Sequence, residues 1–124
     1  MSANITDLVI GSYEIAKDHG FWDEPYNIGD ETTGDISNPL SIPTKLWLAA
    51  GELVEAGNIH HKYGITDPGN LDEFIEEIAD VFIRLFDLCG YVLDPGLQFH
   101  KLEDAIIKKM IKNKGRPHKH GKNY

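Results

Sequence analysis

Two stretches decide the fold: LWLAAGELVEA at residues 46–56 and EEIADVFIRLFDL at residues 76–88. In both stretches apolar residues recur at helical spacing, and two carboxylates stand three residues apart. Residues three apart share one face of a helix, so each pair should aim two carboxylates at one point. The pairs are Glu52 with Glu55, and Glu77 with Asp80.

Working outward, the same periodicity predicts four helices, at about 4–19, 43–62, 70–91 and 94–113. The connections between the last three are short, which favours antiparallel neighbours in a bundle. A chain of 124 residues has the length of one domain. We therefore expect an all-α fold, an antiparallel bundle of about four helices, forming a single domain over 1–124.

The starts of the third and fourth helices are predicted from their capping residues. Asn70 is a good N-cap, and Glu73 follows it as a capping-box partner. Asp94 and Pro95 are typical of the N-cap and first position of the fourth helix.

A long irregular segment at 21–43 and a basic tail at 114–124 flank the helical regions. The segment opens with Phe21 and Trp22, whose rings could stack on a base. The alternative is a hydrophobic plug over the end of the bundle.

The charge distribution is asymmetric. All 20 acidic residues fall within 1–104, beside 5 basic ones, whereas 105–124 hold 7 Lys or Arg and no acid. An acidic body argues against broad nucleic-acid binding. No apolar run is long enough for a membrane span, and the N-terminus lacks a signal-peptide pattern. Cys89, the single cysteine, is expected to be a buried thiol, which fits a cytoplasmic location.

Four converging carboxylates would repel one another, so a hard divalent cation is their natural partner. Ligands that are all carboxylates select Mg²⁺, with Mn²⁺ as a substitute, whereas zinc and copper sites prefer Cys and His. Di-iron bundles need Glu-x-x-His, and Asn58 stands at that position after Glu55. The competing interpretation is a pair of ordinary solvated helix faces.

Phosphate contacts are expected from two places. Lys109, Asn113 and Arg116 follow one line of the fourth helix if its geometry persists to Arg116, and they offer the donors that a polyphosphate needs. Lys45 lies two turns before Glu52 on the same face and is a weaker candidate. A solvated basic helix end is the alternative for the first group.

The combined pattern resembles the MazG-like all-α nucleotide pyrophosphohydrolases, especially the small single-domain forms. The family motif, E-E-x-x-E, a spacer and E-x-x-D, is matched by Glu52 to Glu55 and by Glu77 to Asp80. The resemblance covers roughly 17–122, including HGFWDEP near the start and KKMIKNKGRPHKHGK near the end. Gly51 departs from the pattern, because the motif's first Glu often stands there.

The resemblance implies an Mg²⁺-dependent enzyme that splits a nucleoside triphosphate, NTP or dNTP, into the monophosphate and pyrophosphate. It implies a homodimer or homotetramer in the cytoplasm. It assigns the metal to Glu52, Glu55, Glu77 and Asp80, and phosphate contacts to Lys109, Asn113 and Arg116. Glu52 is our hypothesis for the group that takes the proton of the attacking water.

Three other functions stay open at this point. One is a helical module that binds a nucleotide without hydrolysing it. Another is a related phosphohydrolase of the dimeric dUTPase type. The last is an interaction protein whose basic tail contacts nucleic acid weakly. Base and sugar preference are not readable from the spacing.

Overall fold

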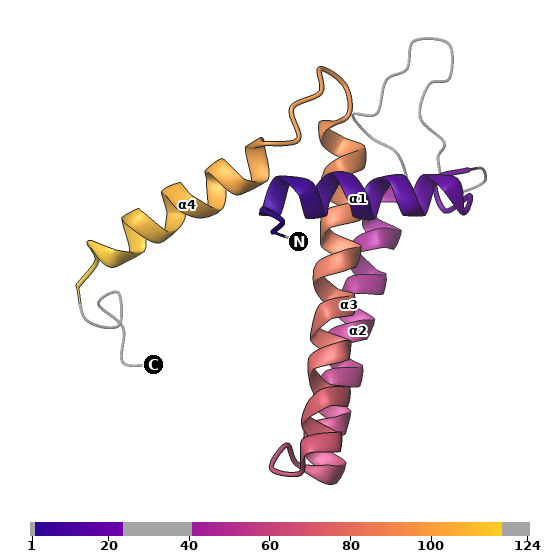
Figure 1. Cartoon of the computed structure of the whole chain (residues 1–124), viewed down its shortest axis with the longest axis vertical. Helices are drawn as coiled ribbons and strands as arrows, with labels where there is room; N and C mark the ends of the chain where they lie inside the picture. Colours follow the sequence, from indigo (N-terminus) through magenta and orange to yellow (C-terminus); the bar gives the residue numbers. More distant parts are fainter. Residues whose placement is uncertain (1, 24–40, 118–124) are drawn as a thin grey trace.

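The computed structural model describes residues 2–23 and 41–117, and within them the chain forms four helices and no strand. This confirms the predicted all-α class. The helices are α1 (Ile5–Asp18), α2 (Ser41–Tyr63), α3 (Pro68–Leu93) and α4 (Lys101–Lys114). Figure 1 shows α2 and α3 side by side as a long antiparallel pair, with α1 crossing the pair near one end and α4 extending away from it.

Helix α1 begins at a capping box. The side chain of Asn4 accepts a hydrogen bond from the backbone N–H of Asp7, and the Asp7 side chain accepts one from the backbone of Asn4. Such reciprocal bonds satisfy two backbone donors that the first turn of a helix leaves without partners. The helix then buries Val9, Tyr13 and Ala16 on one face.

Tight packing of α1 on α3 depends on Gly90. A Cβ atom at Gly90 would lie 2.3 Å from the Cβ of Tyr13, far inside van der Waals contact. The missing side chain therefore lets the Tyr13 side chain lie directly against α3. The Tyr13 hydroxyl donates a hydrogen bond to Asp94 Oδ2 at 3.2 Å, which anchors the same crossing point.

Helix α3 starts earlier than predicted. Its N-cap is Asp67, not Asn70, and the Asp67 side chain accepts a hydrogen bond from the backbone N–H of Gly69 at 2.8 Å. Pro68 takes the first helical position, where its fixed φ suits a helix and its missing N–H costs nothing. The Asn70 and Glu73 capping box was therefore a wrong prediction, because the aspartate and proline before it start the helix first.

Helix α4 starts later than predicted. Asp94 is the C-cap of α3 rather than the N-cap of α4, and the chain turns through Gly96 and Leu97, both at positive φ. Left-handed residues interrupt a right-handed helix, so α4 begins only at Lys101. The prediction failed because the carboxylate of Asp94 is the acceptor for Tyr13.

The predicted segment 21–43 and tail 114–124 are only partly within the described residues. Residues 41–43 belong to the first turn of α2, and Lys114 is the last residue of α4. Residues 21–23 and 115–117 are also described, whereas 24–40 and 118–124 lie outside the described residues. Cys89 is half-buried rather than fully buried, and burial raises the pKa of its thiol.

The packed core sits where α1 crosses α3. It contains Tyr13, Ala16, Leu88, Tyr91 and the ring of Trp22, with Ile42 and Phe99 against it. Elsewhere α2 buries only the small side chains of Ala49 and Ala56 and the longer one of Lys45. Within residues 2–23 and 41–117, no helix has the length and hydropathy needed to cross a membrane.

Candidate metal centre and adjoining cleft

The antiparallel pairing of α2 and α3 brings three carboxylates together. Glu52 and Glu55 stand one turn apart on α2, and Glu77 faces them from α3. Oxygen atoms of the three side chains all lie within 4.8 Å of one another. Three of the four carboxylates predicted from spacing therefore form one cluster, which could hold a metal ion.

Asp80, the fourth predicted ligand, is not part of that cluster. Its exposed side chain instead lines a cleft beside Glu52, one turn along α3 from Glu77. Spacing alone placed both carboxylates of the E-x-x-D pair at one point. The structure divides them between the cluster and the adjoining cleft.

The three clustered carboxylates differ in their electrostatic surroundings. Arg84 Nε lies 2.9 Å from Glu52 Oε1, and this hydrogen bond is the main reason that the pKa of Glu52 lies below its ordinary value. Desolvation, together with the neighbouring Glu55 and Glu52, raises the pKa of Glu77 to about 7. When no cation lies between crowded carboxylates, their repulsion raises the pKa of one of them, which then keeps its proton to higher pH.

Glu77 also provides the strongest sign that a ligand belongs here. Its Oε2 is buried and makes no hydrogen bond with any residue that the structure describes. A buried oxygen without a partner is costly, and a hard divalent cation would satisfy it while neutralising its neighbours. The donor set is all oxygen, which fits Mg²⁺ or Mn²⁺.

A cleft of about 580 Å³ runs from this cluster toward the crossing helix α1. Its volume lies within the range of small-molecule sites, and its walls mix apolar side chains with a few charged ones. Its lining comes from α1, α2, α3 and Phe21, which lies three residues beyond the end of α1: Ser12, Ile15, Ala16, Phe21, Thr44, Lys45, Leu48, Glu52, Asp80, Ile83, Arg84 and Asp87.

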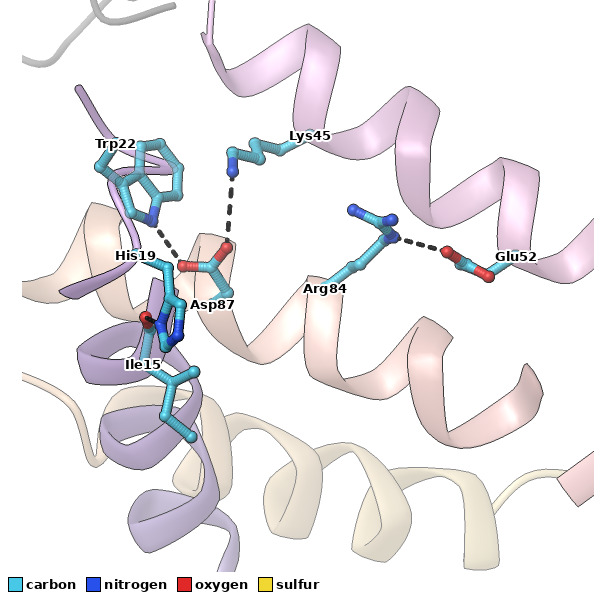
Figure 2. Close-up of polar contacts among 7 residues, drawn as sticks. All are labelled: Ile15, His19, Trp22, Lys45, Glu52, Arg84 and Asp87. Carbon is cyan, nitrogen blue, oxygen red and sulfur yellow. Dashed lines mark hydrogen bonds and ion pairs between the residues drawn. The ribbon is translucent and has the colours of Figure 1, made fainter. Parts of the chain in front are cut away.

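The inner part of the cleft is built around Asp87. The indole Nε1 of Trp22 donates a hydrogen bond to Asp87 Oδ1, and Lys45 Nζ lies 3.7 Å from Asp87 Oδ2 (Figure 2). Asp87 and Lys45 are both at least nine-tenths buried. Burial raises the pKa of Asp87, and the contacts with Trp22 and Lys45 oppose that rise.

The two aromatic residues proposed for base stacking have different surroundings. Trp22 is buried, with its ring stacked on Tyr91 at 3.9 Å between centroids and Lys45 Nζ 4.6 Å from its centre. Trp22 is thus part of the core, and its ring offers little surface to a ligand. Phe21 is 60% exposed and lines the cleft, so it alone of the two presents a ring to a ligand.

The residues predicted to contact phosphate are separated. Lys45 lines the cleft, but Lys109 and Asn113 are exposed on α4, and Arg116 follows that helix. Figure 1 shows α4 extending away from the α2–α3 pair, and none of these three lines the cleft. A single chain does not bring them to the carboxylates.

Two interactions in the site, one made by Arg84 and one by Asp87, were not predicted from the sequence. Arg84 and Asp87 follow Asp80 by four and seven residues, which puts them on its face of α3, but their partners on other elements were not predicted. The antiparallel register supplies both partners on α2, since it sets Lys45 opposite Asp87 and Glu52 opposite Arg84. The opposite charges of Lys45 and Asp87, and of Arg84 and Glu52, were the feature of the sequence that could have indicated these pairs.

Comparison with models of known protein families, with curated proteins and with solved structures gives no match. The function is therefore argued from the motifs and from the geometry of the site.

Proposed function

We propose that this protein is a MazG-like nucleoside triphosphate pyrophosphohydrolase, which hydrolyses an NTP or dNTP to the monophosphate and pyrophosphate with Mg²⁺. The observation that carries the proposal is the cluster of Glu52, Glu55 and Glu77 beside a cleft of nucleotide size. A cation site next to a largely apolar cleft can hold the phosphates at one end and the nucleoside in the other.

The three carboxylates would hold Mg²⁺, and Asp80 lies next to them in the cleft wall. When bound, the cation supplies charge neutralisation of the phosphate oxygens and lowers the pKa of a bound water. In the reaction a water oxygen bonds to the α-phosphorus, the bond from that phosphorus to the bridging oxygen breaks, and pyrophosphate leaves with the electron pair. A carboxylate takes the proton of the water.

Two carboxylates compete for the role of proton acceptor. Glu52 was our hypothesis from the motif, but the bond from Arg84 lowers its pKa and makes it a weaker base. In the metal-free cluster the pKa of Glu77 is raised to about 7, which makes it the stronger base of the two, and a bound Mg²⁺ would lower that pKa. Glu52→Gln and Glu77→Gln separate the two, because only loss of the acceptor removes the acidic limb of the pH–rate profile, along which the acceptor loses its own proton.

A second copy of the chain is part of this proposal. Outside the cleft lining, α2 and α3 expose large apolar side chains, which together are called the apolar face. Several are more than half exposed, Trp47 the most at 80%. The residues are Leu46, Trp47, Leu53, Val54, Leu71, Ile75 and Phe82. They offer roughly 800 Å² of side-chain surface, taking about 200 Å² for each side chain, near the share of one partner in a stable dimer.

The oligomer would also explain the position of α4. Lys109, Asn113 and Arg116 cannot serve the cleft of their own chain while α4 extends away from it. In a homodimer or homotetramer they would contact the phosphates bound to a neighbouring copy. The acidic cluster and the basic helix have the complementary charges that such an arrangement needs.

The test is direct quantification of monophosphate and pyrophosphate from a panel of NTPs and dNTPs with Mg²⁺. Glu55→Gln should abolish turnover, because it removes one of the clustered carboxylates. Glu76→Gln is the matched control, since Glu76 is an exposed carboxylate of α3 outside the cluster. Binding of nucleotide without any turnover by the wild-type protein would favour the non-catalytic module instead.

A further inference from the structure

We infer that the inner end of the cleft is the base pocket and that Lys45 selects nucleotides whose base carries a carbonyl oxygen at its recognition edge. The inference rests on the proposed function and deepens it. It reassigns Lys45, which the sequence had suggested as a phosphate contact, to the opposite end of the substrate.

The position of Lys45 along α2 suits a contact with the base of the nucleotide. Lys45 precedes Glu52 by seven residues, which is about 10 Å along a helix axis. In the proposed reaction the α-phosphate would lie at the carboxylate cluster. About 10 Å is the length of a nucleoside monophosphate from its phosphate to the far edge of its base. The β- and γ-phosphates would then extend in the other direction, away from Lys45.

The side chains around Lys45 suit a base better than a triphosphate. The inner cleft has apolar walls in Ile15, Leu48 and Ile83, and the exposed ring of Phe21 lies at the same end. Such walls suit a flat base and provide no counter-charge for a triphosphate. Lys45 Nζ lies over the Phe21 ring, 5.4 Å from its centre, so a base that enters this end of the cleft beside Phe21 would meet the ammonium group.

The hydrogen bonds that Lys45 can donate favour a base with a carbonyl oxygen. Asp87, the acidic side chain beside Lys45, already has Trp22 on one oxygen and Lys45 near the other. Lys45 is donor-only, with Asp87 at 3.7 Å and the rings of Trp22 and Phe21 beside its ammonium group, and its three N–H groups allow one more bond to a ligand acceptor. A carbonyl of uracil, thymine or guanine accepts such a bond, whereas the exocyclic amino group of cytosine or adenine presents a second donor to the ammonium group.

The experiment compares matched bases by equilibrium binding. Non-hydrolysable α,β-imido dUTP and dCTP differ at the base edge by a carbonyl against an amino group at C4 and by a donor against an acceptor at N3, and α,β-imido dGTP and dATP extend the comparison to purines. Each is titrated calorimetrically into the wild-type protein with Mg²⁺. The uracil nucleotide should bind at least about tenfold more tightly than the cytosine one, because the wrong base leaves a buried donor unsatisfied.

Three variants locate the preference. Lys45→Met removes the ammonium group while keeping most of the apolar stem, and it should reduce the uracil-to-cytosine ratio to about one. Lys45→Arg keeps a donor and should keep the preference. Lys62→Met is the matched control, because Lys62 is an exposed lysine of the same helix, and it should change nothing. Circular dichroism verifies that each variant is folded.

The outcomes distinguish failure of this inference from failure of the proposed function. Equal affinity for uracil and cytosine nucleotides in the wild-type protein overturns the inference whether or not Lys45→Met folds. A preference that survives in folded Lys45→Met overturns it as well. In both cases hydrolysis of natural triphosphates would still support the proposed function. If no nucleotide is bound or hydrolysed, the proposed function fails, and the inference fails with it.

Discussion

Arg84 on α3 and Glu52 on α2 form a hydrogen-bonded ion pair, with Arg84 Nε 2.9 Å from Glu52 Oε1, at the edge of the carboxylate cluster (Figure 2). The pair joins the two long helices at the level where Glu55 and Glu77 approach Glu52. One carboxylate of the cluster is thus held ionised by a cation, while another, Glu77, has its pKa raised to about 7. The pH dependence of stability can therefore distinguish them.

Removing the cation of this pair should cost a small amount of stability. Because 37% of the Arg84 side chain is exposed, water screens the pair, and we expect Arg84→Met to lower the free energy of unfolding by about 0.5–1 kcal/mol at pH 7. The pKa of Glu52 is lowered on folding, so the pair stabilises above the ordinary pKa of 4.5 and loses its effect as pH falls below it. Denaturant unfolding of the wild type, Arg84→Met, Glu52→Gln and the double variant at pH 7 and pH 3.5 measures the coupling. Additive effects at pH 7 would contradict the prediction.

Glu77 should give the opposite pH dependence. Its pKa is raised on folding from 4.5 to about 7, so the folded state holds a proton that the unfolded state releases. In the metal-free protein the contribution of Glu77 to stability should fall as pH rises from about 4.5 to 7. Melting temperatures measured across this window should decline less in Glu77→Gln than in the wild type. Glu76→Gln, which changes an exposed neighbour, should retain the wild-type slope.

Removal of the metal should abolish turnover. The proposed reaction relies on a divalent cation at Glu52, Glu55 and Glu77, so excess EDTA should stop pyrophosphate release and added Mg²⁺ should restore it. Mn²⁺ should substitute, because it accepts the same oxygen ligands. Full activity in excess EDTA would contradict the proposed role of the cluster. The melting temperature should rise with Mg²⁺ in the wild type and respond less in Glu55→Gln.

Local sequence patterns predicted the helices well, and predicted part of the site. Helical periodicity identified all four helices, and the three-residue spacing of Glu52 and Glu55 placed both on one face of α2. The boundary errors arose where a tertiary contact decided the outcome. Asp94 has the sequence features of an N-cap, but its carboxylate accepts a bond from the distant Tyr13 hydroxyl.

The inner cleft could not be predicted for a related reason. Trp22 and Asp87 are 65 residues apart, and no local pattern links an indole to a carboxylate at that separation. The separation of Asp80 from the cluster likewise depends on how α3 is rotated against α2, which spacing along one helix does not determine. Helical spacing indicated which residues share a face of α2 or α3 but not their partners on other elements.

The contact between Gly90 and Tyr13 predicts a large effect from one methyl group. In Gly90→Ala the new Cβ would lie 2.3 Å from the Cβ of Tyr13, and neither atom can move without shifting a helix. We expect a loss of about 1–3 kcal/mol or more in unfolding free energy, as for other overpacked cores. Gly11→Ala is the matched control, because nothing lies within 4 Å of its new Cβ and α1 should gain about 0.5–1 kcal/mol. Equal denaturation midpoints for the two variants would contradict this account of the helix crossing.

The apolar face of α2 and α3 predicts the assembly. If a second copy covers it, the wild-type protein should have at least about twice the mass of the 13.9 kDa chain in light scattering. Trp47→Glu places a charge at the most exposed side chain of the face, where a dimer interface would bury it without a partner. The variant should therefore be a folded monomer with an unchanged helical signal. Leu8→Glu, at a half-exposed position of α1 away from this face, should leave the mass unchanged. A wild-type protein that is monomeric at every concentration tested would remove the second copy from the proposal. Lys109 and Asn113 would then be unable to contact the phosphates.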